Sequence, residues 1–175
     1  MTDDRERWAR ICRGETSAFE AFYRENALRL RSFLWQLVGD RQSAEDIMQE
    51  TFAQLWQRPN GFHPDRGSLT GYLFGIGRKR AAEWWRQCPE KEIPLAAEPP
   101  QRPVEPISLL KDALAKLDPE PRALLWLREV EGQTYAELAQ ILDIPLGTVK
   151  SRLFNAREQL RRIWLGSGKE TRHNS

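Results

Sequence analysis

The sequence contains few of the residues that build disulfide frameworks, metal centres or catalytic sites. Its 175 residues include two cysteines, Cys12 and Cys88, and two histidines, His63 and His173. The cysteines match no metal-ligand spacing, so we expect free thiols in a reducing compartment. No glycine-rich phosphate loop, metal-spaced cluster or nucleophile motif occurs. These absences predict a protein without a metal or other cofactor, and they argue against an enzyme.

Long apolar runs are also missing from the sequence. No run approaches the roughly 20 apolar residues that a membrane-spanning helix requires. The first residues, MTDDRERW, are charged and lack the apolar core of a signal peptide. The net charge is only +2, so the chain is not a polybasic binder and its charge is patterned locally instead. We therefore expect a soluble, cytoplasmic protein without membrane insertion.

The sequence has no strong strand signal and no internal repeat, whereas apolar residues recur at helical spacing in several segments. The exception is CPEKEIPLAAEPPQRPVEP, which contains six of the eleven prolines and cannot continue a helix or a central strand. We predict an all-α fold of two small helical domains. The expected parts are residues 1–87 and 107–165 as domains, 88–106 as a Pro-rich linker and 166–175 as a disordered tail.

The strongest pattern lies between Gln133 and Trp164 and predicts a helix-turn-helix in the C-terminal domain. Thr134 and Glu137 have the spacing of a capping box, and Pro145 suits the first turn of a second helix. The second helix carries one apolar stripe, formed by Val149, Leu153, Ala156, Leu160 and Ile163.

Polar side chains lie off this stripe near the start of the second helix. We call them the recognition set: Thr148, Lys150, Ser151, Arg152 and Asn155. In a helix-turn-helix the second helix offers its N-terminal residues to the major groove, where Arg and Lys bind guanine or phosphate and Asn pairs with adenine. The alternative is an ordinary surface helix, but the agreement of cap, turn, stripe and polar set favours DNA binding.

An acidic segment, SAEDIMQETFAQLWQR, follows an earlier helix that starts with a predicted capping box at Ser17 and Glu20. Its polar side, the acidic face, consists of Glu45, Asp46, Gln49 and Glu50. Phe52 and Trp56 form a second apolar edge, which could be a contact surface. The acids either complement the dipole at a helix N-terminus or form a docking face for a basic partner.

A basic and aromatic helix, SLTGYLFGIGRKRAAEWWRQ, follows the loop PNGFHPDRG and can be capped by Ser68. Its basic–aromatic face consists of Tyr72, Arg78, Lys79, Arg80 and Trp84. Such interleaving suits a groove that neutralises phosphates and stacks exposed bases, although the aromatics could instead be core residues. The glycines at 71, 75 and 77 permit close approach of a neighbouring helix or of DNA.

Taken together, these segments resemble an extracytoplasmic-function (ECF) sigma factor, from the small two-domain branch of the bacterial sigma family. The family's opening helix resembles AFEAFYRENALRLRSFLWQLVGD, and its polymerase-docking helix resembles SAEDIMQETFAQLW. Its −10 element helix resembles GSLTGYLFGIGRKRAAEWWR. Its −35 domain resembles LDPEPRALLWLREVEGQTYAELAQILDIPLGTVKSRLFNAREQLR, so the resemblance covers roughly residues 15–165.

The resemblance implies an alternative sigma factor that binds RNA polymerase core and directs promoter-specific transcription initiation. The implied partners are a coiled coil of the largest polymerase subunits, promoter DNA as duplex and as melted non-template strand, and an anti-sigma factor. Core docking would use the acidic face with Phe52 and Trp56. The −10 strand would bind Asn60, Phe62, Tyr72, Arg78, Lys79, Arg80 and Trp84. The −35 duplex would bind Thr134, Tyr135, Thr148, Lys150, Ser151, Arg152 and Asn155.

The chain departs from the family pattern at three positions of the −10 helix. Lys79 replaces a common Asn, Glu83 a common Asp and Tyr72 a common Trp. A lysine cannot reproduce the paired donor and acceptor of an amide, so the −10 base preference stays open.

The alternatives to a sigma factor are a stand-alone transcriptional regulator and an enzyme. A stand-alone helix-turn-helix regulator explains residues 133–164 but neither the acidic nor the basic–aromatic helix. An enzyme with an appended DNA-binding domain lacks a catalytic constellation.

Overall fold

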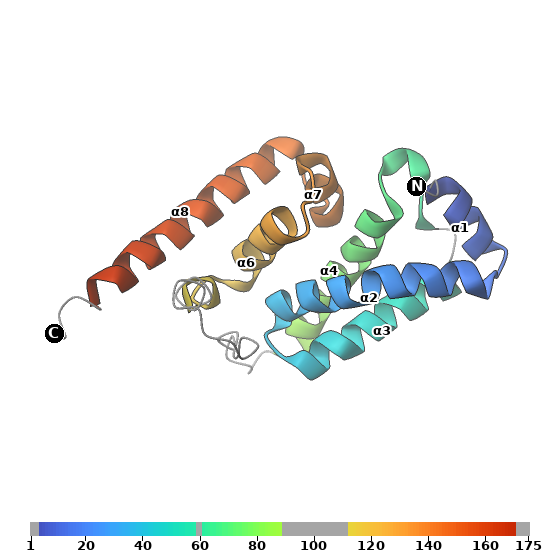
Figure 1. Cartoon of the computed structure of the whole chain (residues 1–175), viewed down its shortest axis with the longest axis horizontal. Helices are drawn as coiled ribbons and strands as arrows, with labels where there is room; N and C mark the ends of the chain where they lie inside the picture. The colour runs from blue at the N-terminus through green and yellow to red at the C-terminus, as the bar shows by residue number, and fades with distance from the viewer. Residues whose placement is uncertain (1–3, 59–60, 89–111, 171–175) are drawn as a thin grey trace.

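The computed structural model describes residues 4–58, 61–88 and 112–170, with side chains placed up to residue 166. All regular elements within these ranges are helical, which confirms the predicted all-α fold. The helices with defined bounds are α1 (Asp4–Cys12), α2 (Thr16–Val38), α3 (Arg41–Gln57), η2 (Pro64–Arg66), α4 (Leu69–Gln87), α6 (Pro119–Leu125), η3 (Trp126–Val130), α7 (Tyr135–Leu142) and α8 (Leu146–Glu170). Residues 112–115 are helical as well. Helices α1–α4 form one group and α6–α8 a second (Figure 1).

The N-terminal group is built on α2, because its apolar stripe contacts both α3 and α4. Phe22, Leu30 and Phe33 of α2 are fully buried, and Phe74 of α4 stacks on Phe33 at 5.3 Å between ring centroids. Helix α2 ends at Gly39, whose φ of 71° is the left-handed conformation that glycine adopts without a steric penalty.

Two of the helix starts in this group differ from the sequence-based expectation. The predicted capping box at Ser17 and Glu20 is wrong, because Glu15 occupies the N-cap and Ser17 lies in the first turn of α2. Helix α3 begins before Ser43, since the Asp40 carboxylate accepts the Ser43 backbone N–H at 2.8 Å. The cap predicted for α4 is confirmed: Ser68 Oγ accepts the Gly71 N–H at 3.0 Å.

The C-terminal group contains the predicted helix-turn-helix. Thr134 Oγ1 accepts the Glu137 N–H at 3.2 Å, and the Glu137 carboxylate accepts the Thr134 N–H at 2.7 Å, which confirms the capping box. Asp143 ends α7 at a φ of 56°. The Pro145 carbonyl then accepts the Val149 N–H at 3.1 Å and starts α8.

Helix α8 is longer than the sequence predicts. Residues 166–170, which the sequence assigns to the tail, continue α8 to Glu170. Gly166 does not adopt the left-handed conformation that ends α2 at Gly39, so the helical backbone continues through it. Residues 171–175 and the linker beyond Cys88 lie outside the described residues.

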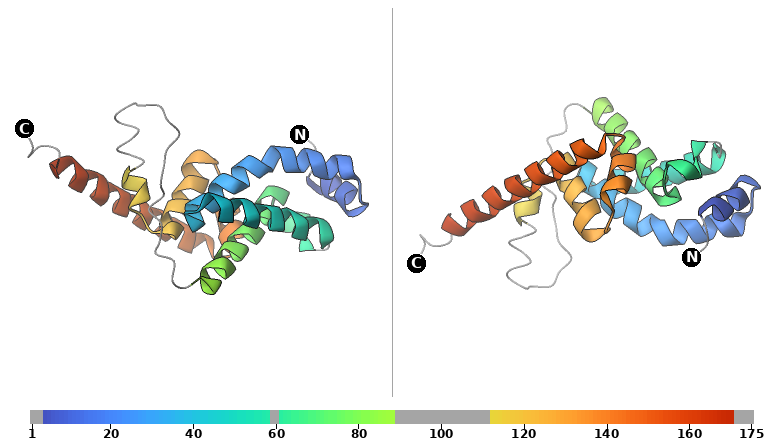
Figure 2. Two further views of the ribbon diagram at one scale, coloured as in Figure 1. Left: turned by 90° about the horizontal axis from the view of Figure 1, so that it is seen from below. Right: turned by 90° about the horizontal axis from the view of Figure 1, so that it is seen from above.

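The two groups pack against each other, α6 on α2 and α7 on α4 (Figures 1 and 2). Arg122 of α6 is 2% exposed and donates from Nη2 and Nε to the Gln36 carbonyl at 2.8 and 3.1 Å. Arg29 of α2 and Glu131 form an ion pair at 2.6 Å. The chain therefore folds with its helix-turn-helix seated on the N-terminal group.

Candidate functional site

The recognition set lies at the exposed start of α8. Lys150, Ser151, Arg152 and Asn155 are exposed and Thr148 is half-buried, whereas Val149 and Leu153 are buried beneath them. The alternation follows from the helical spacing of the apolar stripe. The structure thus brings the predicted set together on one surface, in the geometry that a major groove accepts.

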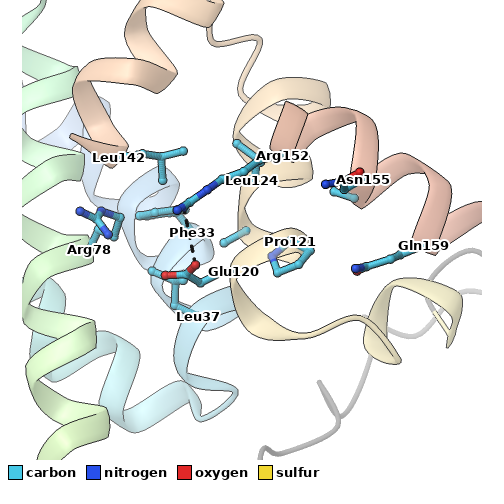
Figure 3. Close-up of a pocket in the computed structure, with 12 residues that line it drawn as sticks. Phe33, Leu37, Arg78, Glu120, Pro121, Leu124, Leu142, Arg152, Asn155 and Gln159 are labelled. Carbon is cyan, nitrogen blue, oxygen red and sulfur yellow. Dashed lines mark ion pairs between the residues drawn. The ribbon is translucent and has the colours of Figure 1, made fainter. Parts of the chain in front are cut away.

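Arg152 and Asn155 also line a cavity between the two helical groups. Arg152 Nη1 lies 3.8 Å from the Glu120 carboxylate, and its side chain remains 47% exposed (Figure 3). The cavity measures about 220 Å³, and Phe33, Leu124 and Leu142 form part of its wall. Exposed ion pairs contribute at most about 1 kcal/mol, so Arg152 is free to exchange Glu120 for another partner.

Thr134 and Tyr135 lie at the start of α7 and already have structural contacts. The Thr134 hydroxyl donates to Glu137 Oε2 at 2.8 Å within the capping box. Tyr135 is half-buried, with the Arg128 guanidinium 5.1 Å from its ring centroid.

Phe154 was missed by the sequence reasoning. Its side chain is 64% exposed on the outward side of α8, beside Ser151 and Asn155. The available signal was its position off the apolar stripe, where an aromatic residue has no core to join. An exposed phenyl ring at this place is suited to apolar contact with a thymine methyl group.

The acidic face lies on α3, beyond its first turn. Asp46, Gln49 and Glu50 are exposed, and Glu45 is half-buried beside Arg31 at 3.3 Å. A helix dipole acts on charges within the first turn, and α3 begins at Arg41 with no acid there. Dipole complementarity therefore does not explain these carboxylates, and the docking interpretation gains weight.

The expected exposure of Phe52 beside this face is wrong. Phe52 is 3% exposed because α2 covers it, with Tyr23 and Phe19 at centroid distances of 4.7 and 6.2 Å. Trp56 is 37% exposed and packs on Phe19 at 4.8 Å. Of the predicted apolar edge, only Trp56 reaches the surface.

The aromatic part of the predicted −10 site is divided between core and surface. Phe62 is 4% exposed, between Trp8 at 5.4 Å and Tyr72 at 5.7 Å, so it supports the site from below instead of forming its surface. Tyr72 is half-buried, and this burial raises the pKa of its hydroxyl. Asn60 lies outside the described residues.

Trp84 is half-buried at the C-terminal end of α4. It packs edge-to-face on Trp85, with 5.0 Å between ring centroids. The Trp85 indole N–H donates to the Leu37 carbonyl at 3.0 Å. This bond fixes Trp85 against α2, and Trp84 packs on the fixed ring.

Each cation of the basic–aromatic face has a different partner. Arg78 Nε donates to the Ile141 carbonyl at 3.2 Å, and Lys79 Nζ lies 3.8 Å from the Asp143 carboxylate. Arg80 pairs with Glu50 of the acidic face at 2.7 Å. The face is therefore connected to α7 on one side and to the acidic face on the other.

A cavity of about 460 Å³ opens along this face of α4. The N-terminal group lines it with Phe62, His63, Tyr72, Lys79 and Arg80. The C-terminal group lines the opposite side with Gln140, Ile141 and Asp143. An aromatic floor with flanking cations is the arrangement that stacks bases and neutralises phosphates.

The described residues contain neither a cluster that could bind a metal ion nor a helix that could span a membrane. No three His, Cys, Asp or Glu side chains within residues 4–58, 61–88 and 112–166 gather closely enough to hold a metal ion. Across the described helices, none combines the length and hydrophobicity needed to cross a bilayer. Cys12 and Cys88 are free thiols.

Sequence comparison gives two family matches that follow the two helical groups. Residues 22–88 match the family described as Sigma-70 region 2, and residues 107–160 match Sigma-70, region 4. The chain is 31% identical to the ECF RNA polymerase sigma factor RpoE of Cereibacter sphaeroides, covering 92% of this chain and 98% of the relative. It is also 31% identical to the longer ECF RNA polymerase sigma factor SigE of Mycolicibacterium smegmatis, covering 82% of this chain and 60% of the relative.

Structural comparison agrees with the sequence matches. The sigma factor RpoE from Bartonella quintana, solved with the anti-sigma factor NepR, superimposes with a TM-score of 0.67. The two chains are 25% identical, and the match covers 83% of this chain and 95% of the other. The similarity thus extends over both helical groups.

Proposed function

This chain belongs to the ECF family of RNA polymerase sigma factors, and from that premise we propose how its residues divide promoter recognition. As a member, it is an alternative sigma factor that directs promoter-specific transcription initiation. The observation that carries this function is the pairing of both sigma regions in one chain, each on its own helical group. A stand-alone helix-turn-helix regulator would leave residues 22–88 without a role.

The start of α8 recognises the −35 element as duplex. The recognition set supplies hydrogen bonds to base edges and phosphates, and Phe154 adds apolar contact with a thymine methyl group. Thr134 and Tyr135, at the start of α7, contribute contacts to the DNA backbone, which position the helix without specifying sequence. The exposure of these side chains supports this assignment.

The basic–aromatic face of α4 and the preceding loop bind the melted −10 strand. Tyr72 and Trp84 provide rings for base stacking, and Lys79 neutralises a phosphate. Phe62 holds Tyr72 in place, and we assign Asn60 of the same loop to the strand as well. The cavity along α4 supports this assignment, because it has room for an extruded base.

The acidic face docks on the polymerase core, at a coiled coil of the largest subunits. Asp46 and Gln49 are exposed and project from α3, and the partly exposed Trp56 provides an apolar contact beside them. Complementary charge steers such encounters and fixes their register.

The remaining assignments concern whole segments of the chain, its location and a further partner. We assign residues 1–87 to core docking and −10 binding, 107–165 to −35 binding and 88–106 to a tether. Members of this family are initiation factors, so we assign this chain no bond chemistry and a cytoplasmic location beside the polymerase. Because the Bartonella quintana neighbour was solved with an anti-sigma factor, we also propose an anti-sigma partner here.

Run-off transcription tests this function. Sigma-free bacterial core polymerase, the full chain and fragmented host DNA should give discrete transcripts whose start sites share two spaced elements. The matched control is core polymerase alone. Sequence-specific duplex binding without any transcript would contradict the sigma function and favour the stand-alone regulator.

A further inference from the structure

Helix α1 contacts the loop and the helix start that we assign to the −10 strand. The Asp4 carboxylate accepts the Leu69 backbone N–H at 2.8 Å, across 65 residues of sequence. Trp8 packs edge-to-face on Phe62, with 5.4 Å between ring centroids. In Figure 1, the N-terminal end of α1 lies beside the segment that leads into α4. Helix α1 thus holds this segment although it precedes the residues that match Sigma-70 region 2.

Helix α1 is itself fixed on α2. Arg7 donates to both carboxylate oxygens of Glu25, at 2.6 and 3.1 Å. A pair with two parallel bonds fixes orientation as well as distance. Trp8 and Ile11 are buried three residues apart, so apolar contact holds the same side of the helix. The contacts between α1 and the loop therefore have a fixed base on α2.

The Asp4 carboxylate completes the N-terminal cap of α4. The first N–H groups of a helix have no partner within the helix. Ser68 Oγ accepts one of them, from Gly71, and Asp4 Oδ2 accepts another, from Leu69. A negative charge is also favoured at this end of the helix dipole. Asp4 therefore fixes where α4 begins relative to α1.

A continuous series of aromatic contacts connects α1 with the strand cavity. Trp8 contacts Phe62, and the Phe62 ring lies 5.7 Å from the Tyr72 ring. The loop backbone also lies against Tyr72, because a Cβ atom on Gly61 would collide with the Tyr72 hydroxyl. Tyr72 lines the cavity in which we propose base stacking. A shift of Trp8 would therefore change the position of the stacking ring.

The loop divides its side chains between α1 and the cavity. Phe62 packs on α1, and Asp65 pairs with Arg5 of α1 at 2.7 Å. The residues that follow them, His63 and Arg66, are exposed and line the cavity. The Arg5–Asp65 pair is exposed on both sides, so it contributes less than the other two contacts. By holding Phe62 and Asp65, α1 sets the positions of His63 and Arg66.

We propose that α1 is a positioning element for the −10 strand site, and that Asp4 and Trp8 hold this site in its binding geometry. This inference rests on the proposed role of the loop and α4 in strand binding. The two residues act through Leu69, Phe62 and Tyr72 and not by contact with the strand. Ordering a loop on binding costs free energy, so a loop that is held in advance binds the strand more tightly.

The lifetime of promoter complexes tests this proposal. The complex contains core polymerase, the full chain and a promoter fragment recovered by run-off transcription, and heparin captures polymerase that dissociates. Trp8→Ala should shorten the lifetime about tenfold, the effect of losing one base–aromatic stack. Asp4→Ala should shorten it about threefold, the effect of losing one hydrogen bond at the site. A smaller folded fraction would lower the number of complexes but not the lifetime of each.

Conservative variants test the geometry of each contact. Trp8→Phe keeps an aromatic ring at the contact with the loop. Asp4→Asn keeps an oxygen that accepts the same backbone N–H. Both variants should therefore retain most of the wild-type lifetime, whereas the alanine variants should not.

Two control variants on α1 separate positioning from stability. Ile11→Ala empties a buried position but leaves the Arg7–Glu25 pair in place, so it should lower the free energy of unfolding without changing the lifetime. Glu6→Ala removes an exposed acid from the same turn as Asp4 and should change neither quantity. Affinity for immobilised core polymerase should equal that of the wild type in every variant.

The outcomes distinguish this proposal from the proposed function. Wild-type lifetimes in Trp8→Ala and Asp4→Ala, equal shortening in Ile11→Ala, or an equal loss of core affinity would each overturn the positioning role. If Trp8→Ala does not fold, the comparison of Asp4→Ala with Asp4→Asn decides. Transcripts from the wild-type chain with no effect of these variants would leave the promoter role intact. Absence of wild-type transcripts would overturn the proposed function, and this inference with it.

Discussion

The start of α8 and the basic–aromatic face of α4 are both candidate DNA surfaces, yet one faces solvent and the other borders α7. Lys150, Ser151 and Asn155 point away from the core, whereas Arg78 and Lys79 contact α7. Duplex DNA is always present in the cell, but a melted −10 strand exists only within a polymerase complex. The difference shows that one candidate surface faces solvent, whereas the other borders the neighbouring helical group.

The largest expected effect comes from the acidic face, which we propose as the surface that docks on the polymerase. Asp46→Arg should weaken binding to core polymerase by on the order of 100-fold, because it places a cation where the partner is basic. Asp46 accepts only a Gln42 amide at 2.9 Å among its described bonds, so the fold should persist. Surface plasmon resonance with immobilised core measures the effect.

Glu20→Arg is the matched control for this change, since Glu20 pairs within α2 with Arg24 at 3.5 Å. Unchanged core affinity in Asp46→Arg would show that the acidic face has another role. Glu50 is less suitable for this test because it also pairs with Arg80 of the strand face.

The next largest effect concerns duplex binding by the recognition set at the start of α8. Arg152→Ala should cost about 1–3 kcal/mol in −35 duplex binding and relax base preference at one position, if the guanidinium contacts a base edge. Binding to a library of −35 variants measures both quantities. Arg161→Ala, on the same helix at 70% side-chain exposure, is the control. Uniform loss on every sequence would assign Arg152 to a phosphate instead.

A smaller effect is expected from Phe154. Phe154→Ala should cost about 1 kcal/mol on −35 duplexes that contain thymine, through lost apolar contact. It should change the free energy of unfolding by less than about 0.5 kcal/mol, because the ring is exposed. Fluorescence titration with thymine and uracil versions of one site isolates the methyl group. Equal affinity for both versions would show that the ring does not touch it.

The smallest expected effect concerns stability and not recognition. Thr134→Ala should lower the free energy of unfolding by about 1 kcal/mol, because it removes the N-cap of α7. Urea unfolding followed by circular dichroism measures it. Ser151→Ala, which loses only a hydroxyl bond to the Thr148 carbonyl at 3.0 Å, is the control. A neutral Thr134→Ala would mean that the capping box does not hold α7.

Local features of this structure could be predicted from sequence because their causes are local. The caps at Ser68 and Thr134, the turn at Pro145 and the stripe of α8 each depend on residues within one or two turns. The exposure of the recognition set followed directly from that stripe.

The remaining features depend on residues that are distant in sequence. Phe52 is buried because Phe19 and Tyr23 of another helix cover it, and Phe62 is buried beneath Trp8. The residue pattern within segments 43–58 and 59–67 does not show which residues of other helices will cover these two rings. The seating of α7 on α4 is likewise a tertiary result, for which the glycines of α4 were the available hint.

Crosslinking in a promoter complex tests the central contrast most directly. The complex contains core polymerase, the full chain and a photoreactive thymine analogue, placed either in the −35 duplex or in the −10 non-template strand. The account predicts crosslinks from the −35 position to the start of α8 and from the −10 position to α4. Crosslinks from the −10 strand to α8, or from the −35 duplex to α4, would contradict it.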